Sequence, residues 1–291
     1  MRTAHKLNKS LNNVYLLDYL RKKKKTLKKL KISEYKKKSE MIIQNELSVS
    51  REEIYFNRNY LSKNQISKLD KNFDKLEQDF PVQHIIEKTF FYEAEFFTPK
   101  KVFIPRPETE ILVDQVHNYI NTKNKKLKIV DLCTGSGCIV LSLAKKNPNH
   151  QFIGLDISND AITVSKINSK KLNTSNVEFK NENMFEYIFR NVDIITCNPP
   201  YLAANEIEKL ERSVKNHDPI DALTDHEDGT SFYLFLIKNF NTIVKNGGTI
   251  FFEIPSTNVA SKIFDILSQN STINYDIFKD FEGNNRVIRI Y

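Results

Sequence analysis

Apolar residues recur at near-helical spacing between residue 27 and about residue 80. The positions that carry this period are Leu27, Leu30, Ile32, Tyr35, Met41, Ile42, Ile43 and Leu47. Ser50 and Glu53 have the spacing of a capping box, in which each side chain bonds the backbone of the other at a helix start. Ser62 marks the start of a further helix, which Pro81 ends because proline has no N–H group to donate. This pattern predicts a small helical domain over residues 27–86.

An aromatic, extended stretch follows over residues 82–104. Its aromatic residues are Phe90, Phe91, Tyr92, Phe96, Phe97 and Phe103. Aromatic side chains favour strands, so we expect a β-hairpin linker over residues 87–106. Pro105 and Pro107 frame a turn, after which Glu108 begins a helix that runs to about Ile120.

From Lys126 onward, short apolar runs alternate with helical stretches. The expected strands are 127–132, 152–156, 177–180, 193–197, 249–254, 275–279 and 286–290, and the main helices are 139–146, 159–172, 231–244 and 258–267. Alternation of this kind is typical of a doubly wound α/β sheet. We therefore expect residues 107–291 to form a Rossmann-like domain with a seven-stranded sheet.

Positive charge is concentrated at the N-terminal end of the chain. The 291 residues carry a net charge of +8, but residues 1–40 alone hold 14 basic and 3 acidic side chains, and the rest of the chain is net negative. We expect residues 1–26 to be a basic extension that makes weak contact with ribosomal or other nucleic-acid phosphate. The alternative is a solvated, lysine-rich face.

The cysteine count and the absence of long apolar runs indicate in which cellular compartment the protein works. The chain has only three cysteines and no apolar run of about 18 residues, which predicts a reducing compartment and no membrane span. Residues 1–20 have no acidic residue before Asp18, so an organelle transit peptide is permitted, although arginine is scarce. We expect a cytoplasmic monomer, with an organelle matrix as the alternative location.

The first βα turn of the expected sheet carries a glycine-containing loop, Val-Asp-Leu-Cys-Thr-Gly-Ser-Gly, at residues 130–137. Gly135 and Gly137 let the backbone turn tightly at the sheet edge where ligands bind. Asp156 ends the next strand, where a carboxylate can accept hydrogen bonds from both ribose hydroxyls of an adenosine. A dinucleotide loop needs a third glycine where Val140 stands, and a P-loop needs lysine where Cys138 stands. The loop therefore favours S-adenosylmethionine, and a tight turn without a ligand is the alternative.

A second motif, Asn198-Pro199-Pro200-Tyr201, ends the fourth strand at the same edge. It suits a planar NH₂ acceptor, such as a carboxamide or an adenine, whose nitrogen is a poor nucleophile. The Asn198 side-chain oxygen and the Pro199 carbonyl oxygen can accept its two N–H bonds. The prolines make the rim rigid, and Tyr201 supplies a flat face for stacking. Such positioning would turn the nitrogen towards an activated methyl group.

These motifs resemble those of the peptide chain release factor glutamine methyltransferases, the HemK-type or PrmC-type family of class I S-adenosylmethionine-dependent methyltransferases. The linker motif is Phe-Ile-Pro-Arg-Pro-Glu-Thr-Glu at residues 103–110. Further matches lie at residues 80–86, 131–137, 198–201, 217–219, 222–223, 228–229, 233, 247–248, 253, 280 and 286–287. The resemblance covers residues 80–291 well, and residues 27–80 only in their helical character.

The resemblance implies methyl transfer from S-adenosyl-L-methionine to the side-chain amide nitrogen of the glutamine in the Gly-Gly-Gln motif of class 1 release factors. It implies that Asn198, Pro199 and Tyr201 are catalytic. It implies a cofactor site made of Cys133, Thr134, Gly135, Ser136, Gly137, Asp156, Met184 and Asn198. It implies a substrate site made of Asn198, Pro199, Pro200, Tyr201, Arg106 and Glu108.

Three positions depart from the family pattern. Cys133 stands where the family often has glycine, Met184 where it often has an aromatic or acidic residue, and Asp218 where it usually has glutamate. Arg106 and Glu108 have two interpretations, a charged clamp near the substrate or a helix start whose acidic residues complement the dipole. The cysteine spacing fits no standard zinc site, so we expect no metal.

Three other functions stay open at this stage. Adenine in DNA or RNA is also a planar NH₂ acceptor, but a flipped base needs a strand-binding surface. A glutamine of a ribosomal protein is another acceptor. A catalytically idle domain tethered to the ribosome by the basic arm is the third, although it would have no need for Asp156, Asn198 and Tyr201.

Overall fold

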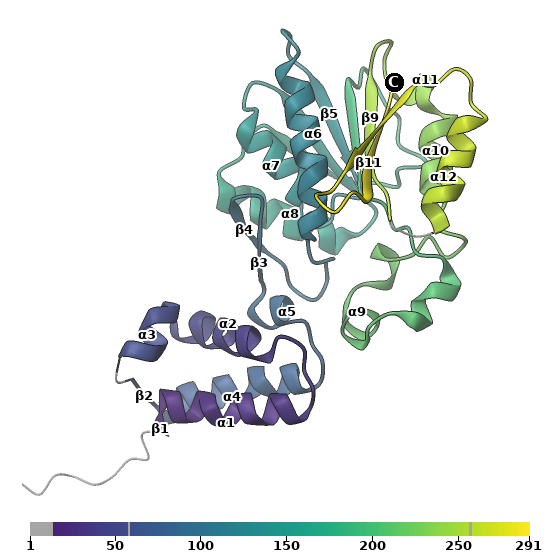
Figure 1. The fold of residues 1–291 in the computed structure, drawn as a ribbon. Coiled ribbons are helices and arrows are strands. Elements are labelled where there is room, and N and C mark those ends of the chain that lie inside the picture. The colour runs from purple at the N-terminus through teal and green to yellow at the C-terminus, as the bar shows by residue number, and fades with distance from the viewer. Residues whose placement is uncertain (1–13, 58, 256–257) are drawn as a thin grey trace, which may run out of the picture. The chain divides into compact units, whose positions relative to one another are not determined.

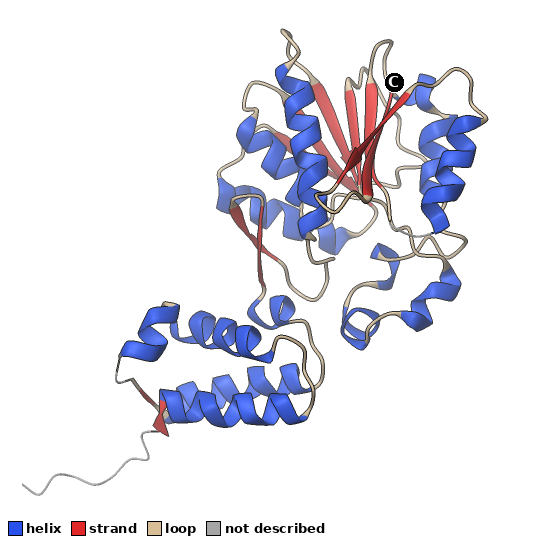
Figure 2. Cartoon of the chain, in the orientation of Figure 1, coloured by secondary structure: helices blue, strands red, loops and turns tan. Residues whose placement is uncertain are grey.

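The computed structural model describes residues 14–57, 59–255 and 258–291, and the chain divides into two compact units, residues 1–86 and 87–291 (Figure 1). The first unit is helical, as Figure 2 shows. Its elements are β1 (Val14–Tyr15), α1 (Leu16–Lys29), α2 (Tyr35–Leu47), α3 (Arg51–Phe56), β2 (Tyr60–Leu61), α4 (Lys63–Glu77) and α5 (Val82–Ile86). The two short strands pair antiparallel.

Local capping starts two of these helices. The Glu53 N–H donates to Ser50 Oγ at 3.2 Å and the Ser50 N–H donates to the Glu53 carboxylate at 2.7 Å, so the capping box expected there is confirmed. Ser62 makes the same reciprocal pair with Gln65 at the start of α4. Helix α4 ends at Glu77, before Pro81, and α5 begins directly after this proline, so the expected end of the helix before Pro81 is confirmed.

The start of the helical unit differs from the expected boundary at residue 27. Helix α1 begins at Leu16, and the apolar side chains of Leu16, Tyr19, Leu20 and Leu27 are buried in the core of this unit. These positions follow helical spacing, but the lysine run between them hides the period in the sequence. Residues 14–26 are therefore part of the helical unit, and residues 1–13 of the expected extension lie outside the described residues.

The second unit begins with a hairpin of β3 (Lys88–Phe91) and β4 (Ala94–Phe97). Its turn residues Tyr92 and Glu93 both have positive φ, as a tight two-residue hairpin turn requires. The hairpin is tied to helix α8 (Asn159–Leu172), because the Phe97 N–H donates to Asn168 Oδ1 at 2.7 Å. A 3₁₀ turn, η1 (Pro107–Thr109), then leads into α6 (Glu110–Asn121).

A seven-stranded sheet lies at the centre of this unit, in the order β10-β11-β9-β8-β5-β6-β7, and only β11 pairs antiparallel with its neighbours. The strands are β5 (Lys128–Leu132), β6 (Gln151–Asp156), β7 (Val177–Asn181), β8 (Ile194–Cys197), β9 (Thr249–Glu253), β10 (Tyr275–Lys279) and β11 (Asn285–Ile290). All seven expected strands are present, and the predicted doubly wound α/β fold is confirmed.

Helices cover both faces of the sheet (Figure 1). Helices α6, α7 (Cys138–Lys146) and α8 lie on one face, and α10 (Ser231–Lys238), α11 (Phe240–Ile243) and α12 (Asn258–Ser268) lie on the other. Alternate residues along each central strand enter the two separate cores, as Ile129 and Val130 of β5 do. Short helices η2 (Ala204–Lys209), α9 (Arg212–His217) and η3 (Ile220–Ala222) fill the segment between β8 and α10.

One expected helix is broken. The stretch 231–244 was expected to be continuous, but it divides at Asn239 into α10 and α11. The backbone leaves helical values at Asn239 (φ −101°, ψ 10°), although its N–H still donates to the Phe235 carbonyl oxygen at 3.0 Å and its side-chain amide donates to the same oxygen at 2.9 Å. No helix of the described residues is long and apolar enough to cross a membrane.

Candidate active site

Three parallel neighbouring strands end at one edge of the sheet, and each brings part of the site there. Strand β5 pairs with β6 on one side and with β8 on the other. The loop 133–137 follows β5, Asp156 is the last residue of β6, and Asn198 directly follows β8. The topology therefore gathers the two motifs, which are more than 60 residues apart in the sequence.

The loop after β5 turns through left-handed backbone conformations. The φ angles are 56° at Cys133, 56° at Gly135 and 79° at Gly137. A side chain with a β-carbon pays about 1–2 kcal/mol for this conformation, so Cys133 is strained where the family often has glycine. The Thr134 N–H donates to the Leu155 carbonyl oxygen at 3.1 Å and anchors the loop to β6.

Asp156 is held by backbone donors at the wall of the site. Its Oδ2 accepts the Gly135 N–H at 2.8 Å, and its Oδ1 accepts the Ser158 N–H at 2.9 Å. Burial raises the pKa of this carboxyl, and the hydrogen bonds from Ser158 and Gly135 oppose that rise. A carboxylate has about four acceptor sites, so each oxygen still has capacity for a ligand hydroxyl.

Asp131 supports the loop from inside the sheet. Its two oxygens accept the hydroxyls of Thr134 at 2.6 Å and of Thr196 at 2.7 Å, which links β5, its loop and β8. Complete burial, with a smaller contribution from the nearby Asp156 charge, raises the pKa of Asp131 to about 7. Asp131 belongs to the loop motif, but nothing in the sequence around it indicates this bridging role.

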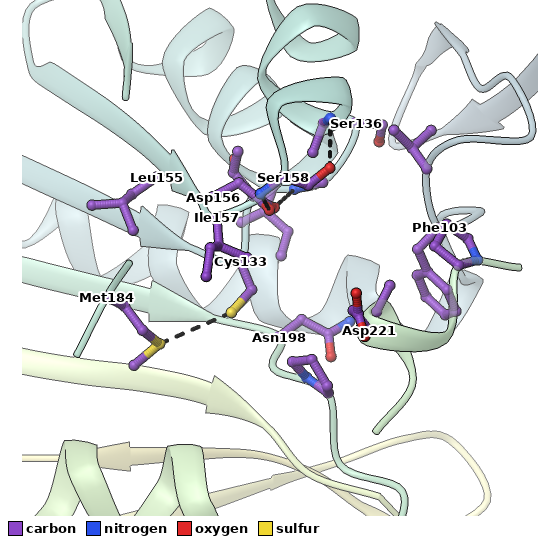
Figure 3. A pocket seen from close by; sticks show the side chains of 18 of the residues that line it. Phe103, Cys133, Ser136, Leu155, Asp156, Ile157, Ser158, Met184, Asn198 and Asp221 are labelled. Atoms are coloured by element: carbon purple, nitrogen blue, oxygen red, sulfur yellow. Dashed lines mark hydrogen bonds between the residues drawn. The ribbon is translucent and has the colours of Figure 1, made fainter. Parts of the chain in front are cut away.

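A cavity of about 510 Å³ opens at this edge (Figure 3). Seven of the eight residues expected at the cofactor line it: Cys133, Thr134, Gly135, Ser136, Asp156, Met184 and Asn198. Gly137 does not line the cavity. It is the N-cap of α7, where an added β-carbon would lie 3.0 Å from the Leu141 side chain. Because Gly137 has no side chain, the backbone can pack closely against Leu141 of α7.

Met184 and its neighbours form one wall of this cavity. Met184 is buried, and its sulfur lies 4.0 Å from the Cys133 sulfur, as Figure 3 shows. The next residue, Phe185, stays 44% exposed and packs against Phe232, with ring centroids 5.2 Å apart. Phe185 and Phe232 both line the cavity, so an aromatic surface lies beside the position where Met184 departs from the family pattern.

A smaller cavity of about 150 Å³ lies on the other side of Asn198. Its walls are mostly apolar and come from Phe103, Arg106, Asn198, Pro199, Tyr201, Leu202, Leu210, Val214, Ala222 and Leu223. Phe103, Asn198 and Ala222 line both cavities. Pro199 and Tyr201 face only the smaller one, whereas Pro200 faces only the larger one. The tetrapeptide therefore separates the two spaces.

Arg106 and Glu108 differ in their placement. Arg106 lines the smaller cavity, pairs with the buried Asp218 carboxylate at 2.9 Å and lies 4.6 Å from the Phe103 ring centroid. Asp218, which stands where the family usually has glutamate, thus has a partner. Glu108 is exposed and lines neither cavity, so its position matches the helix-start interpretation better than a substrate clamp.

Asn198 is oriented by a residue that the sequence analysis did not select. Its Nδ2 donates to Thr109 Oγ1 at 3.2 Å, and Thr109 is buried at the start of α6. Burial, followed by the nearby Glu253 charge, raises the pKa of Tyr201 to about 12, so its phenol stays neutral. In the part of the chain that the structure describes, no group of three His, Cys, Asp or Glu side chains could hold a metal ion.

Comparison with known proteins identifies the family. Residues 18–86 match the model of the PrmC N-terminal domain, and residues 123–228 match a methyltransferase domain. The release factor glutamine methyltransferase of Clostridium acetobutylicum is 36% identical over 276 residues, covering 93% of this chain and 96% of that protein. The chain belongs to the release factor glutamine methyltransferase family. The resemblance expected from the motifs is confirmed.

Other relatives of this methyltransferase agree. The family members of Thermodesulfovibrio yellowstonii and Bacillus subtilis are 35% and 32% identical, and they cover 87% and 78% of this chain. These matches cover 91% and 81% of the two relatives. The solved hMettl16 catalytic domain matches with a TM-score of 0.55 at 14% identity, over 80% of this chain and 84% of that chain, which shows the shared fold. The chain is an S-adenosylmethionine-dependent methyltransferase, as the loop and Asp156 predicted.

Proposed function

We propose that this protein transfers a methyl group from S-adenosylmethionine to the side-chain amide nitrogen of the glutamine in the Gly-Gly-Gln motif of class 1 release factors. The observation that carries the proposal is the junction at Asn198, which lines both the larger and the smaller cavity. A donor in one space and an acceptor in the other would meet beside this side chain. The relatives' activity on release factors supports the choice of acceptor.

The residues of the larger cavity fit the cofactor. Its volume lies in the usual range for small-ligand sites. Asp156 has acceptor capacity left for two ribose hydroxyls, and the loop 133–136 brings backbone close to the ligand space. When bound, S-adenosylmethionine supplies an electrophilic methyl group on a positively charged sulfur.

The residues of the smaller cavity fit an uncharged carboxamide. We propose that Asn198 Oδ1 and the Pro199 carbonyl oxygen accept the two N–H bonds of the glutamine amide. Tyr201 and Phe103 supply flat apolar walls, and the rim prolines have no N–H that could compete. Arg106 is neutralised by Asp218, so no unpaired charge at this wall attracts a charged acceptor. These residues hold and orient the nitrogen, which is the main requirement for a weak nucleophile.

Mass spectrometry of a release factor after incubation with enzyme and cofactor tests this function. We expect one added methyl group on the Gly-Gly-Gln peptide and none on a release factor whose motif glutamine is replaced by asparagine. Asn198→Ala should abolish transfer, because it removes the oxygen that accepts from the acceptor amide, and should leave cofactor binding largely intact, because Asp156 and the loop 133–136 remain at the larger cavity. Unmethylated release factor together with methylated adenine in DNA or RNA would overturn the proposal in favour of the nucleic-acid alternative.

We further propose that the basic N-terminal region makes weak contact with nucleic-acid phosphate. On α1, Lys23 and Lys24 pair with Asp70 and Glu40, whereas Lys22 and Lys25 are exposed. Binding to ribosomes that falls steeply with added salt would support this contact.

We also propose that the protein acts as a monomer in the compartment of its release factor, the cytoplasm or an organelle matrix. Light scattering of the purified chain measures its mass.

A further inference from the structure

Two buried polar residues lie behind Asn198, on the side away from the expected acceptor. Thr109 ends η1 and is 2% exposed, and Glu253 ends β9 and is 6% exposed. Burying a carboxyl group and a hydroxyl group costs free energy unless hydrogen bonds compensate for the lost water. Helix capping does not explain the buried hydroxyl of Thr109, because Thr109 occupies the N-cap position of α6 but makes no side-chain capping bond.

The contacts of Thr109 connect Glu253 to Asn198. Asn198 Nδ2 donates to Thr109 Oγ1 at 3.2 Å, and the Thr109 hydroxyl lies near enough to the buried Glu253 carboxyl to lower the pKa of that group. A hydroxyl has one proton to donate and lone pairs that accept. When that proton points to a Glu253 oxygen, Thr109 accepts from Asn198, which is the direction of the 3.2 Å contact. The amide of Asn198 then presents its NH₂ group to Thr109, and its oxygen faces the other way.

The orientation of this amide decides whether the acceptor can be held. With its oxygen towards the smaller cavity, Asn198 accepts an N–H bond from a planar NH₂ group. If the amide were rotated by 180°, two donors would face each other, and the acceptor nitrogen would lose one of its two hydrogen-bond partners. The contact with Thr109, which has the Glu253 carboxyl on its other side, thus fixes the useful orientation.

We propose that Thr109 and Glu253 are positioning residues, which fix the Asn198 amide with its oxygen towards the acceptor nitrogen. This inference rests on the proposed function, since it assumes an NH₂ acceptor at Asn198. Thr109 comes from the linker motif, Asn198 from the strand exit of β8 and Glu253 from the end of β9. The three motifs meet at one point although they are far apart in the sequence.

Two substitutions at Thr109 test the role of the hydroxyl in the full-length chain. Thr109→Val keeps the shape and removes the hydroxyl, so we expect kcat on a release factor to fall by about 10- to 100-fold, the usual scale for a misplaced catalytic group. Thr109→Ser keeps the hydroxyl and should stay within about threefold of wild type. Thr109 also lines the larger cavity, so the Kd for S-adenosylmethionine is measured by calorimetry in both variants and kcat is compared at saturating cofactor, where a weaker Kd does not lower the rate.

Thr249→Val is the matched control. Thr249 begins β9, is fully buried, and donates its hydroxyl to the Ile290 carbonyl oxygen at 2.7 Å. The control loses a buried hydroxyl from the same sheet, and we expect a lower melting temperature with kcat unchanged. A fall in kcat specific to Thr109→Val, restored by serine, is an effect that general destabilisation does not produce.

The outcomes separate this inference from the proposed function. Wild-type enzyme that does not methylate the release factor overturns the proposed function. Active wild-type enzyme with an equally active Thr109→Val variant overturns the positioning role alone. Should the valine variant fail to fold, Thr109→Ala replaces it. Alanine also removes the hydroxyl that Asn198 contacts and introduces no larger group, and we expect a lower kcat at saturating cofactor; wild-type kcat would contradict the inference.

Discussion

Replacing Glu253 with glutamine should change how the stability of the second unit depends on pH. Glu253 is buried, and desolvation raises its pKa from 4.5 to about 7. The Thr109 hydrogen bond and the Arg286 charge lower this pKa, whereas the Glu108 charge raises it, so burial dominates. Glutamine has the shape of the protonated acid and does not titrate.

The sign follows from proton binding. Between pH 4.5 and about 7 the unfolded chain has lost this proton and the folded chain still holds it. Folding then binds a proton, so the free energy of unfolding falls as pH rises through this window. A difference of about 2.5 units at 1.36 kcal/mol per unit gives a total loss of about 3 kcal/mol, of which about 2 kcal/mol falls between pH 5 and 7.5.

Thermal unfolding at pH 5 and at pH 7.5, in buffers of equal ionic strength, measures this effect. Asp131 also has a pKa raised to about 7, so it lowers wild-type stability over the same window. Asp131 is present in both proteins, and the difference between the variant and wild type isolates Glu253. The drop in melting temperature should be smaller in Glu253→Gln by about 4–8 °C. Equal drops in the two proteins would refute the assignment of a protonated, buried Glu253.

Two further changes test the walls of the site. Asp156→Ala should weaken S-adenosylmethionine binding by about 1–3 kcal/mol, because charged hydrogen bonds are lost; unchanged affinity in calorimetry would count against Asp156 as a cofactor ligand. Gly229 has a φ of 84°, and an added β-carbon would lie 2.2 Å from the Tyr201 carbonyl oxygen. Gly229→Ala should therefore lower both the melting temperature and kcat. Gly247→Ala is its control, since Gly247 also has positive φ (73°) but no atom within 4 Å of an added β-carbon, and it should lose only about 1–2 kcal/mol of stability. Equal behaviour of the two alanine variants would show that the Tyr201 contact is unimportant.

Local signals in the sequence predicted the features that depend on near neighbours. The capping box at Ser50 depends on residues three positions apart, and the structure confirms it. The seven strands could be predicted because buried strands of a covered sheet are continuous apolar runs. The start of α1 at Leu16 was missed because a lysine run masks the helical period. The break at Asn239 is a local change in backbone angles that no period reveals.

The sequence alone also predicted which loops carry the chemistry, since glycine at the first βα turn and asparagine before two prolines have few other uses. Only the tertiary structure decided which residues of those loops line the cavities and which have a structural role. It placed Gly137 under a helix, left Glu108 exposed, and paired Arg106 with Asp218. It also brought Thr109 and Glu253 close to Asn198, whose side chain Figure 3 shows in the wall of the cavity. Asn198 and Thr109 are some 90 positions apart in the sequence, and their hydrogen bond depends on where strands and helices begin and end in space. A pattern along the sequence carries no information about the spatial distance between two such side chains.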